Sequence, residues 1–247
     1  MATTDYSNED KVKQYVKKPI THPYLIFPAL LKEIGELKGK KILDLGCGSG
    51  EFSRILAEKG AEVTAIDNSK QMIKLCQENN KTSNNPQFLL MDGSNLKDFR
   101  DNYFDFVIMN MVLINVSEKV VINNIFKEVS RVLKQTGNLI FTDIHPISLM
   151  LEKALTETHE FRSNLLPEEF SYFKDGSIFK SKAMLTDGTF IEFTDAHWTL
   201  ETITSLLSKT GLYLYKIVEP APIKESPKIF SNFKEPILIL FNCKKLV

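Results

Sequence analysis

The 247-residue sequence predicts an α/β fold, in which helices cover both faces of a Rossmann-like, mostly parallel sheet. Three observations predict this class. Short apolar runs alternate with stretches of helical periodicity over the first 145 residues. Several runs are apolar without interruption, which is typical of strands buried on both faces. A glycine-rich segment at residues 46–50 joins the first run to a helical stretch.

The expected elements follow one another closely. Strands are expected at residues 41–45, 62–67, 87–91, 104–110 and 138–144, and helices at residues 24–34, 50–59, 70–79 and 118–134. Ser69 can cap the first turn of the helix after it, because its hydroxyl can accept a bond from a free backbone N–H group. Gly60 and Gly137 stand just past two helix ends, where a left-handed residue is useful.

The regular alternation stops after residue 145, and residues 146–198 are expected to form an insertion that selects the substrate. Within it, Asp175-Gly176 and Asp187-Gly188 each lie between strand-like runs, which is a strong hairpin signal. A small antiparallel sheet is therefore predicted there. The remaining elements of this single domain, residues 1–247, are a helix at residues 200–209 and strands at residues 212–218 and 236–243.

Composition and charge narrow the function. The chain has 31 basic and 31 acidic residues, whereas proteins that bind nucleic acid usually carry a basic excess, so no nucleic-acid partner is expected. No apolar run approaches the roughly 20 residues that span a bilayer, and the polar start lacks a signal peptide, so a cytoplasmic protein is expected. Three cysteines without a C-x-x-C pair predict neither a disulfide nor a structural metal site.

The most informative segment is a buried strand that runs into Gly46, Gly48 and Gly50. Glycines there let the chain turn tightly and bring backbone N–H groups against a ligand at the start of the next helix. Glu51 argues against two phosphate-binding forms of this loop, since a P-loop needs a lysine there and a dinucleotide loop needs a small residue. Together with Asp44, it favours a ligand that has positive charge and no phosphate.

Two further carboxylates end the next two strands. Asp67 closes the run E-V-T-A-I-D about 20 residues after the loop, where an acid can accept hydrogen bonds from both ribose hydroxyls. Asp92 lies in L-L-M-D-G, where it can meet an adenine amino group. Because these strand ends meet at one edge of the sheet, the three acids and the glycine loop are expected to share one crevice.

The ordered segments D-L-G-C-G-S-G, A-I-D-N-S, M-D-G and F-D-F-V-I-M-N resemble the motifs of class I S-adenosylmethionine-dependent methyltransferases. The resemblance covers roughly residues 38–145 and resumes weakly at residues 198–218. It implies S-adenosylmethionine as cofactor, S-adenosylhomocysteine as product, and a seven-stranded sheet whose last strand is antiparallel. It also implies that residues 1–37 form a helical lid. The residues it places at the cofactor are Asp44, Gly46, Gly48, Gly50, Asp67, Asn68, Met72, Asp92, Gly93 and Asn110.

The resemblance also implies where these residues meet the cofactor. The three glycines would pass under the methionine moiety, and Asn110 would offer backbone near it. Asp67 would hold the ribose, Asp92 would meet the adenine, and Met72 would pack on the adenine face.

The residues that bind the methyl acceptor are harder to predict from the sequence. A general base helps when the nucleophile is a hydroxyl or a protonated amine, so His145 and His197 are the candidate catalytic residues. Another histidine, His159, lies in a polar stretch and is expected at the surface. The candidate substrate-binding residues come from the N-terminal segment, the fourth strand end and the insertion: Tyr15, His22, Tyr24, Met111 and Trp198.

The predicted reaction is in-line methyl transfer to oxygen or nitrogen of a small organic acceptor. Enzymes that methylate DNA adenine or protein glutamine resemble one another in [D/N]-P-P-[Y/F] after the fourth strand, and this chain has N-M-V-L there. The alternatives are an RNA or protein methyltransferase, a non-catalytic S-adenosylmethionine-binding regulatory or scaffold protein, and, more distantly, a nucleotide-dependent oxidoreductase. Either a monomer or a homodimer fits the sequence.

Overall fold

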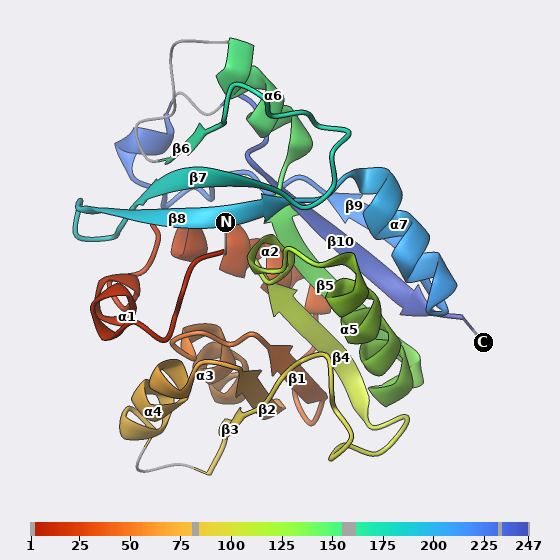
Figure 1. Ribbon diagram of the computed structural model, residues 1–247. Coiled ribbons are helices and arrows are strands. Elements are labelled where there is room, and N and C mark those ends of the chain that lie inside the picture. Colours follow the sequence, from red (N-terminus) through yellow and green to blue (C-terminus); the bar gives the residue numbers. More distant parts are fainter. Residues whose placement is uncertain (1–2, 81–83, 155–161, 232–233, 247) are drawn as a thin grey trace.

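The computed structural model describes residues 3–80, 84–154, 162–231 and 234–246 (Figure 1). Two sheets organise this part of the chain, a seven-stranded sheet in the order β3-β2-β1-β4-β5-β10-β9 and a three-stranded sheet in the order β6-β7-β8. The large sheet contains β1 (Lys41–Leu45), β2 (Glu62–Asp67), β3 (Gln87–Leu90), β4 (Phe104–Asn110), β5 (Leu133–Ile144), β9 (Leu212–Val218) and β10 (Leu238–Lys245). The small sheet contains β6 (Arg162–Leu165), β7 (Ser177–Met184) and β8 (Phe190–His197).

The pairing within the large sheet confirms the predicted α/β class. Strands β1 to β5 pair in parallel, and β10 lies antiparallel to both β5 and β9. The chain order reverses beside β1, because β2 and β3 lie on one side of it and β4 on the other. Ligands of open α/β sheets bind at such a reversal, outside the carboxyl ends of the strands.

Helices and helical turns connect the strands. They are α1 (Glu9–Tyr15), the π-helical turn η1 (His22–Ile26), α2 (Phe27–Ile34), α3 (Glu51–Glu58), α4 (Lys70–Glu78), the 3-10 turn η2 (Leu113–Asn115), α5 (Lys119–Val132), α6 (Pro146–Ala154), α7 (Leu200–Lys209) and the 3-10 turn η3 (Lys228–Phe230). Ser69 caps α4 as predicted, since its hydroxyl accepts a hydrogen bond from the Met72 backbone N–H group at 3.2 Å. None of the helices in the described ranges is long and apolar enough to cross a membrane.

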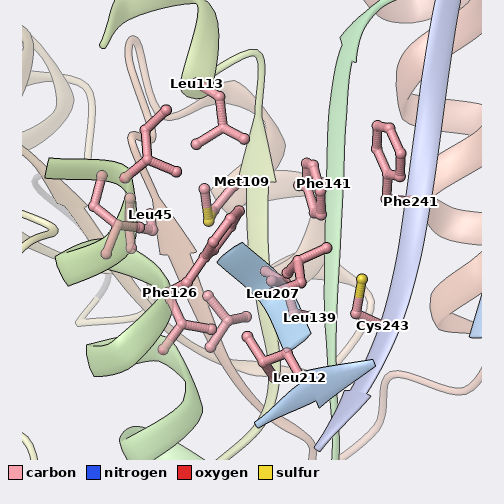
Figure 2. Packing of buried hydrophobic residues seen from close by; sticks show 14 of the residues in the cluster. Leu45, Met109, Leu113, Phe126, Leu139, Phe141, Leu207, Leu212, Phe241 and Cys243 are labelled. Atoms are coloured by element: carbon pink, nitrogen blue, oxygen red, sulfur yellow. The ribbon is translucent and has the colours of Figure 1, made fainter. Parts of the chain in front are cut away.

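Successive apolar residues of the strands point to opposite faces of the large sheet and pack into two separate hydrophobic cores. Ile42 packs with α2, α3 and α4 on one face of the large sheet, and its neighbour Leu43 packs with α5 and α7 on the other. Figure 2 shows the second core, where Phe141 of β5 and Phe241 of β10 stack with ring centroids 4.6 Å apart. Each fully buried Phe side chain contributes about 2 kcal/mol to folding. This burial on both faces explains why the strands are recognisable as apolar runs.

Several element boundaries differ from the prediction. Helix α5 ends at Val132 and β5 begins at Leu133, so Gly137 lies inside the strand and not past a helix end. Leu133 pairs with Phe104 of β4, and this long-range pairing overrides the helical periodicity of the segment. Strand β10 lies two residues later than predicted, and the helix predicted at residues 24–34 begins with η1.

The insertion forms the small sheet, but only one of its two predicted hairpins exists. Asp187-Gly188 joins β7 to β8, whereas residues 171–174 before Asp175-Gly176 form no strand. The Asp175 carboxylate instead accepts hydrogen bonds from the backbone N–H and the hydroxyl of Thr199, at the start of α7. The third strand is β6, and residues 155–161 of the insertion, with His159, lie outside the described residues.

Candidate active site

A cavity of about 180 Å³ lies outside the carboxyl ends of β1, β2 and β4. We call its two sides the floor and the roof. The floor residues come from the large sheet and the segments that follow its strands: Leu45, Gly46, Gly48, Ile66, Asp67, Asn68, Met72, Met91, Asp92, Gly93, Asn110, Met111, Val112, Ile114, Asn115, Val116, Val121 and Ile125. The roof residues come from the N-terminal segment and β8: Tyr6, Tyr15, Pro19, Thr21, His22, Ile26, Phe193 and Asp195.

Most of the predicted cofactor residues lie on the floor. Those that line the cavity are Gly46, Gly48, Asp67, Asn68, Met72, Asp92, Gly93 and Asn110. The other two, Asp44 and Gly50, are placed behind it and do not line it. The floor therefore gathers residues from the ends of four strands, β1 to β4, which are separate in sequence but adjacent in the sheet.

Several backbone N–H groups of the glycine loop donate hydrogen bonds to acceptors within the protein. The N–H groups of Gly46 and Cys47 both donate to the Ile66 carbonyl, at 2.8 and 2.9 Å. Gly48 donates to Oδ2 of Asp67 at 2.9 Å, and Gly50 donates to the Cys47 carbonyl. The sequence led us to expect these groups against a ligand. Because they are already bonded, the loop offers space to a ligand and few free donors for a phosphate.

Glycine is required in this loop for two reasons. Gly46 has a φ of 77°, and a Cβ atom there would lie 2.6 Å from Cγ2 of Val112, in the cavity wall. Gly50 has a φ of 71°, and its Cβ would lie 2.6 Å from the Phe88 ring. Such positive φ angles are strained for residues with a side chain. Gly46 thus keeps the cavity open, and Gly50 lets α3 pack against β3.

Asp67 holds the loop from inside the cavity. Its Oδ2 accepts the Gly48 bond, and its Oδ1 accepts a bond from the Ser69 backbone N–H group at 2.8 Å. Burial raises the pKa of this carboxyl, and the backbone hydrogen bonds partly offset that rise. A carboxylate that is fixed by backbone donors and still lines the cavity is suited to accept further bonds from ligand hydroxyls.

Asp44 is buried more deeply and has a different environment. Only 2% of the residue is exposed, and the Ser53 hydroxyl of α3 donates a hydrogen bond to its carboxyl group. Burial raises the pKa of Asp44 to about 6, which the bond from Ser53 opposes and the charge of nearby Asp67 supports. Asp44 therefore acts on the cavity only through α3 and the loop.

The end of β4 forms a strained part of the wall. Met111 has a φ of 55°, which is uncommon for a residue with a side chain. Its N–H group donates to the Thr142 hydroxyl at 3.1 Å, and its carbonyl accepts a bond from the Asn115 side chain at 3.0 Å. The Thr142 hydroxyl in turn donates to Oδ1 of Asn110 at 2.7 Å. Strain that is held by several bonds at a cavity is a common feature of functional sites.

Aromatic rings from distant segments make the roof. The Tyr15 ring meets those of Tyr6, His22 and Phe193 edge-on, with centroids 5.6 to 6.3 Å apart. Burial raises the pKa of the Tyr15 phenol, so its hydroxyl stays protonated. The N-terminal segment is held over the floor because the Ser69 hydroxyl donates to the Tyr6 carbonyl at 2.6 Å. In Figure 1, β7 and β8 lie across the end of the large sheet toward which β4 and β5 point.

The structure brings only some of the predicted acceptor residues to this cavity. Tyr15, His22 and Met111 line it. Tyr24 instead packs against Phe230, and the Trp198 indole donates to the Val116 carbonyl at 2.8 Å. Neither of these two residues lines the cavity.

The two candidate bases also lie elsewhere. Nε2 of His145 is 3.2 Å from Oε1 of Glu219, and Nε2 of His197 is 2.8 Å from the Tyr172 carbonyl. Burial lowers the pKa of both imidazoles. Neither histidine lines the cavity, so the geometry does not favour them as bases.

Sequence reasoning missed most of the roof, including Tyr6, Thr21, Phe193 and Asp195. The sequence around Asp195 does contain a hint. In the run I-E-F-T-D-A-H, every second residue from Ile191 is buried, and Asp195 occupies one of these positions. A carboxylate at a buried position of an alternating strand is unusual, because burying a charge is costly. The unusual position of Asp195 can therefore be recognised in the sequence, whereas the cavity that Asp195 lines cannot.

The lining suits a ligand without phosphate groups. Among the described residues, the cavity is lined by the carboxylates Asp67, Asp92 and Asp195 and by no lysine or arginine. A pyrophosphate would find no lysine or arginine among these lining residues and few free loop N–H groups, whereas a sulfonium cation would find negative charge. S-adenosylmethionine therefore fits these residues better than a dinucleotide does.

Comparison with known proteins agrees with this fold and site. Residues 43–141 match the family model described as "Methyltransferase domain". "Putative methyltransferase YqeM" of Bacillus subtilis (strain 168) is 30% identical over 208 residues, which cover 77% of this chain and 82% of that protein. The chain belongs to the class I S-adenosylmethionine-dependent methyltransferases, and S-adenosylmethionine is its methyl donor.

Other relatives are more distant or match over a shorter length. Demethylmenaquinone methyltransferase of Staphylococcus aureus (strain MRSA252) is 34% identical over 114 residues, which cover 45% of this chain and 46% of that enzyme. The chain thus spans about half the length of such enzymes. A methyltransferase structure from Mesorhizobium loti covers 88% of this chain and 96% of its own, with a TM-score of 0.62 and 21% identity. Magnesium protoporphyrin IX methyltransferase from Synechocystis, solved with its cofactor bound, covers 97% of this chain and 80% of its own, with a TM-score of 0.53 and 16% identity.

Proposed function

We propose that this methyltransferase acts on an oxygen or nitrogen atom of a small organic acceptor, which binds in the same cavity as the cofactor. One observation carries the proposal, namely that residues of both the floor and the roof line this one cavity. An acceptor that reaches the cofactor must therefore fit between the floor and the roof, which suits a small molecule better than a nucleic acid or a folded protein. The name of the demethylmenaquinone methyltransferases also describes a small organic acceptor.

On this proposal, the floor binds the cofactor. Asp67 accepts hydrogen bonds from the ribose hydroxyls, Asp92 meets the adenine amino group, and Met72 packs on the adenine face. Gly46 and Gly48 leave room for the methionine moiety, and Asn110 lies near it. Asn68 and Gly93 complete this surface, while Asp44 and Gly50 support it from behind.

The chain is proposed to be a single domain, in which residues 1–37 act as a lid and residues 146–198 as a cap. Several contacts support the pairing of lid and cap. The Thr4 backbone N–H group donates to the Thr194 carbonyl at 2.9 Å, and Ile20 donates to the Met184 carbonyl at 2.9 Å. Lys17 forms an ion pair with Asp187 at 2.9 Å. The two segments therefore close over the site together.

The bound cofactor supplies a methyl group that its sulfonium already activates. The task of the protein is then to place the nucleophile in line with that methyl group and to exclude water. Tyr15, His22 and Met111 are placed to contact the acceptor. The catalytic roles of His145 and His197 stay predictions, and His22 is the histidine that the cavity wall offers in their place.

Release of S-adenosylhomocysteine tests the proposal. The purified protein would be incubated with S-adenosylmethionine and, separately, with a panel of small phenols, alcohols and amines, with tRNA and with protein. We expect product only with members of the small-molecule panel. Turnover with tRNA or protein alone would contradict the proposal and favour a macromolecular substrate.

A further inference from the structure

Asp195 is a carboxylate in the buried face of the small sheet. It lies on β8, only 1% of the residue is exposed, and it lines the cavity. Its neighbours on the same face of the small sheet include Phe179 and Phe193, both of which are buried. Burying a carboxylate among apolar side chains is costly unless it is hydrogen-bonded. Because this buried carboxylate also lines the cavity, we ask what it does there.

The position of Asp195 is fixed by its strand and by a partner. Strands β7 and β8 pair over eight consecutive residues, and Asp195 lies opposite Phe179. The Ser181 hydroxyl donates to Oδ2 of Asp195 at 2.6 Å, and Ser181 is itself buried. The pKa of the Tyr6 phenol is raised mainly by burial and, to a smaller extent, by the charges of Tyr15, Asp195 and Asp67. Asp195 therefore acts electrostatically on another residue of the roof.

Asp195 also sets the charge of the acceptor side. Asp67 and Asp92 lie at the ends of β2 and β3 on the floor, where we have placed the cofactor, whereas Asp195 faces the cavity from the opposite wall. Within the described residues, the charged side chains that line the cavity are these three carboxylates, and no lysine or arginine lines it. An anionic group on the acceptor would be repelled by this charge. At an effective dielectric constant of about 20, two negative charges about 6 Å apart repel each other by about 3 kcal/mol.

From these observations we propose that Asp195 accepts a hydrogen bond from the nucleophilic O–H or N–H group of the acceptor, and that the acceptor carries no anionic group. This inference rests on the proposed function. In the transfer step, a lone pair on the acceptor oxygen or nitrogen forms the bond to the methyl carbon. The methyl–sulfur bond breaks and leaves its electron pair on sulfur. The proton of the nucleophile passes to the Asp195 carboxylate, so Asp195 is a catalytic residue.

The experiment compares matched probes on matched variants. The probes are catechol with 3,4-dihydroxybenzoate, and aniline with 4-aminobenzoate, so that each pair differs only in a carboxylate. Binding of each probe to protein saturated with S-adenosylhomocysteine is measured by ligand-observed nuclear magnetic resonance, and turnover is measured with S-adenosylmethionine. The variants are Asp195→Asn and Ser181→Ala. The control is Glu192→Gln, which makes the same charge change at an exposed position of the same strand.

In the wild-type protein and in Glu192→Gln, we expect an uncharged probe to bind more tightly than its carboxylate partner. In Asp195→Asn, this preference should fall by about tenfold or more, because the repelling charge is gone. Ser181→Ala should lower the preference less. A role confined to folding would shift the unfolding midpoint and leave the preference unchanged, which would overturn the inference.

The inference and the proposed function fail in different ways. Equal or tighter binding of the carboxylate probes, or no binding of either uncharged probe, would overturn the inference about Asp195. Methyl transfer to a carboxylate-bearing acceptor would do so while leaving the proposed function intact. Turnover with tRNA or protein alone would overturn the proposed function itself.

Discussion

The floor and the roof of the cavity are built in different ways. The floor comes from strand ends and the segments that follow them, between residues 45 and 125, which lie close together because parallel strands end at one edge of the sheet. The roof joins segments far apart in the chain, as the bond between Thr4 and Thr194 illustrates across 190 residues. A local sequence pattern therefore encodes the floor, whereas the roof exists only once the fold has formed.

The two regions also differ in how they are held. Asp67 and the loop glycines are bonded to neighbouring backbone, and Asp44 is bonded through Ser53. The roof depends more on ring contacts, such as those of Tyr15 with Tyr6 and Phe193. We therefore expect changes on the floor to affect stability and cofactor binding, and changes on the roof to affect the choice of acceptor.

The largest effect is expected from Gly50→Ala. The positive φ costs about 1 to 2 kcal/mol for a residue with a side chain, and the clash with Phe88 adds about 1 to 3 kcal/mol. Gly188→Ala, in the turn between β7 and β8, is the control, because its φ is 82° and no atom lies near its Cβ position. Urea unfolding should show a clearly larger loss of stability for Gly50→Ala. Equal losses would mean that the loop can shift to accept a side chain.

The next effect is a pH dependence of stability. Because burial raises the pKa of Asp44 to about 6, the folded state favours the protonated carboxyl. The stability gained from that preference is complete below the unfolded pKa near 4 and is lost as pH rises through 6. Asp44→Asn has no charge to bury, so it should gain stability relative to the wild type by about 3 kcal/mol between pH 4 and 7.5.

Urea unfolding of both proteins across this pH range measures the difference. Ser53→Ala provides a second variant, since it leaves the carboxyl buried and should not remove the pH dependence. Parallel profiles for the wild type and Asp44→Asn would show that Asp44 does not titrate with a raised pKa.

A smaller effect is expected on cofactor affinity. Asp67→Ala should raise the dissociation constant for S-adenosylmethionine by more than about tenfold, as expected for the loss of one charged hydrogen bond. Asp98→Ala, at an exposed position away from the cavity, should leave it unchanged. Isothermal titration calorimetry measures both. An unaltered affinity in Asp67→Ala would mean that the ribose is bound elsewhere.

The smallest effect is expected from His145→Ala. Its imidazole contacts Glu219 outside the cavity, so kcat/KM for an identified acceptor should change by less than about twofold. His22→Ala, on the roof, should reduce kcat/KM more. If His145→Ala instead lowered kcat by two orders of magnitude, the base predicted from the sequence would have to be restored to the mechanism.

The sequence was sufficient for the sheet, and most strand boundaries were predicted to within a residue or two. Continuous apolar runs identify strands such as β1 and β4, because burial on both faces leaves few polar positions. The boundary at Leu133 was not predictable, since it depends on pairing with Phe104. The hairpin predicted at Asp175-Gly176 was wrong because Asp175 holds the start of α7.

The site residues also fall into those that the sequence predicts and those that depend on tertiary contacts. The positions of Asp67 and Asp92 follow from the rule that strand ends gather at one edge, so the sequence is enough to place both at the cavity. His145 also ends a strand, yet its side chain contacts Glu219, because the direction of a side chain depends on its neighbours. Asp195 was missed because no local pattern shows which residues β8 will face.

The most direct test of this division is a crystal structure of the protein with S-adenosylhomocysteine bound. We predict that the ribose hydroxyls lie within hydrogen-bonding distance of Asp67 and that the adenine lies beside Asp92. Open volume should remain between the sulfur atom and Asp195, where the acceptor would bind. A homocysteine moiety that fills the space at Asp195, or an adenosine bound away from Asp67, would contradict the assignment of floor and roof.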